Sequence, residues 1–251
     1  MSLFKYSSPV AFYPLAGKLA PWFAALALVL GVVGLYLGLV VAPVDFTQGE
    51  IYRILFIHIP TAWMGMFIYV VMAGYGLLAL IFNTRLSAMM MRALAPTGAI
   101  FTALALWTGA LWGNLTWGTW WAWDARNTST LILLFLYFGY MALMNAIEDP
   151  RRADKAGALL VLVGSINIPI IYFSVKWWNT LHQASTIGVS SAPKMHPTMT
   201  AAVLAMVLAC WMYAIAVALI RVRQIIADRE LARLESGGVI PPWLLGKVRV
   251  R

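Results

Sequence analysis

The sequence predicts an all-α integral membrane protein with six transmembrane helices. Of its 251 residues, 62% are hydrophobic and only 11% are charged, whereas roughly a quarter of the residues in a soluble domain are charged. The apolar residues gather in six runs of about 20 residues, the length that a helix needs to cross about 30 Å of hydrocarbon. Inside a bilayer the backbone must satisfy its own hydrogen bonds, which favours helices over irregular chain.

The first three spans are expected at about residues 21–41, 60–82 and 93–113. The first span contains no charged residue. The second is opened by His58-Ile59-Pro60, and Pro60 is expected near the helix start, where its missing N–H group costs least. The third begins directly after Arg92 and ends before a tryptophan-rich stretch.

The other three spans are expected at about residues 128–147, 156–175 and 198–220. A charged loop separates the fourth span from the fifth, and Pro169 is expected to kink the fifth because it removes a backbone hydrogen bond. The six spans form one domain over residues 1–225. Residues 226–251 form a basic cytoplasmic tail, into which the last helix is expected to continue as far as about Glu235.

Lysine and arginine are distributed unevenly between the two ends of these spans. Fourteen of the 18 lie in the N-terminal segment, the loops 83–92 and 148–155, and the tail. The positive-inside rule therefore places both termini in the cytoplasm, and the loops account for the net charge of +9 without a nucleic-acid surface. The three remaining loops lie at the outer face, together with all three histidines of the protein.

One outer loop contains four tryptophans within seven residues, followed by an acidic and a basic residue: Trp117, Trp120, Trp121, Trp123, Asp124 and Arg126. In a helix the first three indoles and the aspartate would share one face, at positions i, i+3, i+4 and i+7. We therefore predict an outer-face tryptophan-rich loop or amphipathic helix. Single tryptophans at a membrane boundary usually form an interfacial belt, but this cluster is denser than anchoring requires.

Two histidines from separate outer loops beside a bed of indoles suit haem as a ligand. Haem iron takes an imidazole nitrogen on each side, the porphyrin takes apolar contact, and the two propionates take cations. His58 and His182 are the candidate axial ligands, and the four tryptophans form the candidate platform. Arg53 and Arg126 are candidate partners of the propionates, with Asp124 orienting Arg126 or an indole N–H group.

Simpler roles stay open for several of these side chains. Arg53 can instead pair with Glu50, and Arg126 with its neighbouring aspartate. His196 precedes a proline at a helix entrance, and we expect it to be structural rather than a ligand. The methionine run at 89–91 is expected to pack against other helices or contact lipid.

The absence of several sequence motifs reduces the number of functions that the chain can be expected to have. The chain has no Cys-x-x-Cys-His motif for covalent haem attachment and no Walker A loop. It is therefore not expected to be an ATPase, and whether it is an enzyme at all stays open. No predicted span contains Asp, Glu, Lys or Arg, which argues against a proton-coupled transporter. Two other functions remain: a membrane haem oxidoreductase that exchanges electrons with quinone, and a small-solute transporter whose tryptophans are only interfacial anchors.

The segment Trp-Gly-Thr-Trp-Trp-Ala-Trp-Asp-Ala-Arg at 117–126 resembles the motif of the tryptophan-rich (WWD) haem-handling family. The segments His-Ile-Pro at 58–60 and Trp-Trp-Asn-Thr-Leu-His-Gln at 177–183 resemble the six-span branch that serves bacterial cytochrome c maturation. The larger synthases of the family have more spans and more histidines. The resemblance covers about residues 10–225, and Asn127 departs from it by standing where an apolar residue is expected.

The resemblance implies non-covalent binding of haem b, with His58 and His182 as axial ligands, at the periplasmic side of the bacterial inner membrane. It also implies haem export and transfer to a periplasmic haem chaperone, which attaches the haem covalently through a vinyl group. The expected partners are that chaperone, the ATPase and permease subunits of an ABC transporter, a small single-span membrane protein and membrane lipid, but no nucleic acid.

Overall fold

The computed structural model describes residues 5–182 and 195–235. Within these residues, six helical spans are long and apolar enough to cross a membrane, which confirms the predicted all-α fold. The elements are η1 (Lys5–Ser7), α1 (Pro9–Tyr36), the π-helical η2 (Leu37–Val41), η3 (Glu50–Ile54), α2 (Leu55–Phe82), α3 (Arg85–Trp117), α4 (Ala125–Ala146), α5 (Pro150–Gly164), α6 (Asn167–Trp177) and α7 (Pro197–Glu235).

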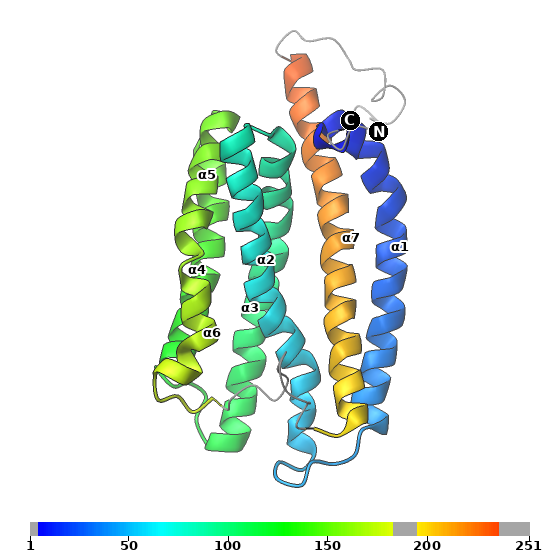
Figure 1. Ribbon diagram of the computed structural model, residues 1–251, viewed down its shortest axis with the longest axis vertical. Helices are drawn as coiled ribbons and strands as arrows, with labels where there is room; N and C mark the ends of the chain where they lie inside the picture. The colour runs from blue at the N-terminus through cyan, green and yellow to red at the C-terminus, as the bar shows by residue number, and fades with distance from the viewer. Residues whose placement is uncertain (1–4, 183–194, 236–251) are drawn as a thin grey trace.

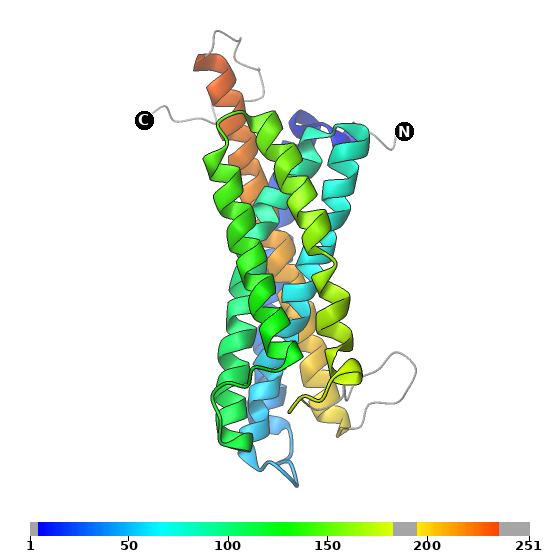
Figure 2. The ribbon, with the colours of Figure 1, turned by 90° about the vertical axis from the view of Figure 1, so that its left-hand side faces the viewer.

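The helices form an elongated bundle in which α2 and α3 lie between two groups (Figure 1). On one side α1 packs along α7, and on the other α4 packs against α5 and α6 (Figure 2). Helices α2 and α3 contact each other closely, and both contact α7. The chain enters and leaves at the same end of the bundle, as an even number of spans requires, and the tryptophan-rich stretch lies at the opposite end.

Tyrosine and methionine side chains fill the core between α2, α3 and α4. Tyr137 of α4 is fully buried, and its hydroxyl donates a 2.8 Å hydrogen bond to the Gly65 carbonyl of α2. Gly98 of α3 makes room for this ring, since a Cβ atom there would lie 2.2 Å from Tyr137 Cζ. Met89–Met91 are also buried in this core, which agrees with the packing role expected for them. The core thus holds together three of the helices that carry the candidate site.

The fifth span is interrupted between α5 and α6, at Ser165 and Ile166. Pro169 has no N–H group and cannot bond the carbonyl four residues earlier, which belongs to Ser165. That carbonyl instead accepts a 3.0 Å hydrogen bond from the Ile168 N–H group. Beside the break, the Asn167 side-chain amide donates to the Ser129 carbonyl of α4 at 2.8 Å. The kink expected at Pro169 is therefore present, displaced by one turn toward the start of the span.

Several helices are longer than the spans expected from hydropathy. Helix α2 begins at Leu55 and follows directly on η3, so Pro60 lies inside the helix and not at its start. Helix α3 includes Arg92, and α7 includes Arg221 and continues to Glu235 as predicted. Arg221 donates to the Thr97 hydroxyl at 2.6 Å. The expectation that no span contains a cation thus holds only for the central part of each helix.

Candidate functional site

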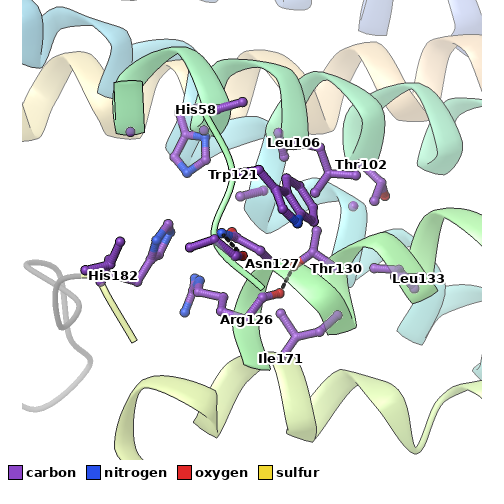
Figure 3. A pocket seen from close by; sticks show the side chains of 18 of the residues that line it. His58, Thr102, Leu106, Trp121, Arg126, Asn127, Thr130, Leu133, Ile171 and His182 are labelled. Carbon is purple, nitrogen blue, oxygen red and sulfur yellow. Dashed lines mark hydrogen bonds between the residues drawn. The ribbon is translucent and has the colours of Figure 1, made fainter. Parts of the chain in front are cut away.

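A pocket lies beside the tryptophan-rich stretch, which joins α3 to α4 at the end of the bundle opposite the start of α1 (Figure 1), and Figure 3 shows this pocket from close by. Its walls come from α2, α3, α4, α6 and the segment that joins α3 to α4, and its cavity volume is about 50 Å³. Six of the nine side chains that the sequence singled out line it: His58, Trp117, Trp120, Trp121, Arg126 and His182. The fold therefore gathers at one place residues that are up to 124 positions apart in the chain.

The two histidines approach each other closely at this pocket. His58 lies in the first turns of α2, and His182 follows the end of α6. Their ring centroids are 6.1 Å apart and the ring planes are inclined by 64°. His182 Nδ1 is buried and has no hydrogen-bond partner among the described residues. Burial, helped by the positive charge of Arg126, lowers the pKa of His182 to about 4, so this imidazole is neutral at physiological pH.

Of the two forms expected for the tryptophan-rich stretch, a loop or an amphipathic helix, the structure shows the loop. Helix α3 ends at Trp117 because Gly118 takes the left-handed conformation, with φ at 73°, and its N–H group caps the Asn114 carbonyl at 3.1 Å. The chain then runs without helical structure as far as Asp124, the N-cap of α4, which begins at Ala125. The indoles therefore do not form the single helical face that their spacing suggested.

The four tryptophans of this loop occupy different environments. Trp117, Trp120 and Trp121 line the pocket, and the Trp117 ring lies 5.9 Å from the ring of His182. Trp121 is directed into the bundle (Figure 3), and its buried indole N–H group has no partner within the described part of the chain. Trp123 does not line the pocket and is 78% exposed. Only the first three rings are thus placed to contact a ligand in the pocket.

Asp124 serves as the N-cap of α4. Its Oδ1 atom accepts a 2.7 Å hydrogen bond from the backbone N–H group of Asn127. The Asn127 side-chain amide in turn donates to the Ala122 carbonyl at 3.1 Å, so the end of the loop is tied to the start of the helix. The ion pair between Asp124 and Arg126, which the sequence left open as a simpler role, is not formed between these two described residues.

Among the described residues that line the pocket, Arg126 has the only Lys or Arg side chain. No hydrogen bond or ion pair of its guanidinium group occurs within residues 5–182 and 195–235. Figure 3 shows the side chain between the loop and His182, directed into the same space as the two imidazoles. An anionic group bound beside the histidines would meet an arginine with its donors available.

Arg53 lies outside the pocket. Its guanidinium group pairs with Glu50, as the simpler interpretation of the sequence allowed, and donates to the carbonyl groups of Gly38 and Ala42. These bonds join η3 to the π-helical end of α1. The structure therefore does not bring Arg53 to the residues that it was predicted to assist.

Three residues of α3 that sequence reasoning did not single out contact His58. Thr108 Oγ1 lies 3.0 Å from His58 Nδ1, and the Trp112 ring meets the imidazole edge-on at 5.7 Å. Gly109 lies against the same ring. Thr108 and Trp112 are four residues apart, about one turn, and Gly109 lies beside them on the same side of α3. No local motif distinguished these residues from other small or aromatic residues of an apolar helix.

His196, which we expected to be structural, does not line the pocket. Its Nδ1 atom accepts a 3.3 Å hydrogen bond from the Thr198 N–H group in the first turn of α7, where backbone donors lack helical partners.

Comparison with known proteins gives a consistent result over the length of the chain. Residues 2–236 match the family model described as Heme exporter protein C. Proteins named Heme exporter protein C are 48% identical in Bradyrhizobium diazoefficiens and 46% identical in Escherichia coli K12, over 77% and 74% of this chain and 74% and 76% of the relatives. The protein of that name from Paracoccus denitrificans is 38% identical over 93% of this chain and 97% of its own length.

Proposed function

This chain belongs to the heme exporter protein C family, and we propose that it binds haem b non-covalently between His58 and His182 and passes it to a periplasmic haem chaperone. The observation that carries the proposal is the meeting of these two imidazoles, 6.1 Å apart, at the mouth of one pocket. The family supports a role in haem handling for cytochrome c maturation. The residues and the direction of transfer are our inference.

The spacing of the two rings suits an iron atom between them. Transition metals bind imidazole nitrogen at about 2 Å, so two axial histidines have their ring centroids roughly 6 Å apart. Among the described residues there is no group of three or more His, Cys, Asp or Glu side chains that could hold a bare metal ion. The iron of a porphyrin already has four nitrogen ligands from the macrocycle, so two imidazoles are enough to complete its coordination.

Charge and aromatic contact around the histidines support a porphyrin in particular. Arg126 offers unused donors beside the imidazoles, as a propionate requires. Trp117 and Trp120 offer partly exposed indole surface at the same opening, since 40% and 56% of their areas are accessible. We propose that Arg126, rather than Arg53, meets a propionate, because Arg53 lies outside the pocket and each of its guanidinium nitrogens already donates to Glu50 or to a backbone carbonyl.

The position of the pocket supports transfer rather than storage. It lies beside the tryptophan-rich stretch at one end of the bundle, and Trp117 and Trp120, which line it, are partly exposed. A haem held there would keep part of its edge open to a soluble partner. This arrangement suits delivery to a chaperone at the periplasmic side of the inner membrane, where the positive-inside rule puts the loop. The ABC transporter subunits and the small single-span protein would then act around this platform.

Purified protein tests the proposal directly. We expect wild-type protein from haem-replete cells to show a Soret absorption band, and His58→Ala, His182→Ala and the double variant to lose it. His196→Ala is the matched control, because His196 lies outside the pocket, and it should keep the band. Colourless wild-type protein, or full haem content in the double variant, would contradict the proposal. Turnover with quinone in the same preparation would instead favour an oxidoreductase.

A further inference from the structure

The Thr108 hydroxyl stands at the centre of a small hydrogen-bond network behind His58. Its Oγ1 atom lies 3.0 Å from His58 Nδ1 and 2.7 Å from the Leu104 carbonyl oxygen of its own helix. A second carbonyl, that of Ala105, lies at 3.4 Å. Both carbonyls can only accept a hydrogen bond, whereas the hydroxyl group can donate one and accept others.

Counting protons in this network assigns the tautomer of His58. The hydroxyl has a single proton, and the short contact to Leu104 is the usual bond of a helical threonine to the carbonyl four residues earlier. The hydroxyl can then only accept from His58, so the proton of the neutral imidazole must be on Nδ1. A neutral imidazole has one N–H group, which leaves Nε2 with a free lone pair.

The surrounding residues of α3 hold the ring in this orientation. A Cβ atom at Gly109 would lie 3.0 Å from His58 Cε1, so the glycine lets the imidazole approach the helix closely. Trp112 packs edge-on against the ring, and its own indole N–H group donates to Gln48 Oε1 at 2.8 Å. The ring is therefore enclosed on its Nδ1 side and directed toward the pocket (Figure 3).

We propose that Thr108 is a positioning residue, which keeps the proton of His58 on Nδ1 and so presents Nε2 to the haem iron. This inference rests on the proposed function, since it concerns how the same site binds haem. His182 differs, because its Nδ1 atom has no partner in the part of the chain that the structure describes. His58 is the member of the pair that this network orients, and His182 lies in the segment that follows α6.

The first test reads the tautomer without haem. The protein has only three histidines, so the ¹⁵N spectrum of histidine-labelled protein is simple, and the His58→Ala variant assigns the His58 signals. We expect wild-type protein to show a protonated Nδ1 and a bare Nε2 at His58. Thr108→Val, which keeps the side-chain shape but removes the hydroxyl, should shift the population toward the other tautomer. An Nε2–H tautomer in wild-type protein would overturn the inference, whatever the haem affinity.

The second test measures haem affinity by titration, together with the electron paramagnetic resonance spectrum of the ferric complex. Loss of a partner that orients a metal-binding histidine typically weakens binding about 10- to 100-fold, and we expect this loss for Thr108→Val. Thr108→Ser should restore wild-type affinity and spectrum. The control is Thr116→Val, because Thr116 also bonds a carbonyl of α3, that of Trp112 at 2.7 Å, without touching His58.

The outcomes separate this inference from the proposed function. If wild-type protein binds haem through His58 and Thr108→Val changes neither affinity nor spectrum, the positioning role is refuted and the haem site stands. If Thr116→Val weakens binding equally, the effect belongs to the helix and the inference again fails. If wild-type protein shows the Nδ1–H tautomer but binds no haem, the proposed function fails while the tautomer assignment survives.

Discussion

In the structure Asp124 caps the backbone of α4, and this role can be distinguished experimentally from an effect of its negative charge. Its Oδ1 atom accepts a 2.7 Å hydrogen bond from the Asn127 N–H group and so caps α4 at the end of the tryptophan-rich loop. Replacing an N-cap aspartate by alanine typically costs about 1 kcal/mol, which corresponds to roughly a fivefold change in a local equilibrium. Asp124→Ala should therefore open the first turn of α4 about fivefold more often. Asparagine and serine cap as well as aspartate does, so Asp124→Asn and Asp124→Ser should stay near wild type.

Hydrogen–deuterium exchange over residues 118–130, read by mass spectrometry in detergent, measures this local opening. Haem retention in the same preparations should fall with Asp124→Ala and stay near the wild-type value with Asp124→Asn. The second carboxylate oxygen, Oδ2, is buried and has no partner among the residues described. If Asp124→Asn loses haem and protection as Asp124→Ala does, the negative charge is what matters, and the capping explanation is refuted.

Two further predictions separate the remaining candidate residues. Trp121 lines the pocket and Trp123 is 78% exposed outside it, so Trp121→Ala should lower haem retention, whereas Trp123→Ala should keep haem and slow only its transfer to the chaperone in a reconstituted assay. Equal haem loss in both variants would contradict separate roles and indicate that the tryptophans act only as interfacial anchors. Arg53→Gln should leave haem content unchanged and increase hydrogen exchange in η3, because Arg53 ties that segment to the carbonyls of Gly38 and Ala42. Haem loss without increased exchange would restore Arg53 as a propionate partner.

Hydropathy and composition were sufficient for the architecture because the bilayer imposes a simple rule. A chain of this length with few charges must cross as helices, and each apolar run is one crossing. Helix ends were predicted less well, since α2, α3 and α7 continue beyond the apolar runs. There they are held by contacts that hydropathy does not report, such as the hydrogen bond from Arg221 to Thr97.

At the candidate site, too, some features could be predicted from the sequence and others depend on tertiary contacts. His58 and His182 could be paired from the sequence because topology alone puts their loops at one end of the bundle, and the structure brings their rings to 6.1 Å. Helical periodicity failed in the tryptophan-rich stretch, because Gly118 takes a left-handed conformation that ends α3. The sequence pattern did not predict this helix end, since glycine is also common within apolar helices.

The sequence by itself thus determined the six spans and the end of the bundle that carries His58, His182 and the tryptophan-rich stretch. These follow from one-dimensional patterns of apolar length, charge and residue type. Only the tertiary structure decided which side chains meet: that Arg126 and not Arg53 lines the pocket, that Trp123 lies outside it, and that Thr108 bonds His58. Such contacts depend on how helices α2, α3 and α4 are rotated and cross, which packing of side chains sets and periodicity does not record.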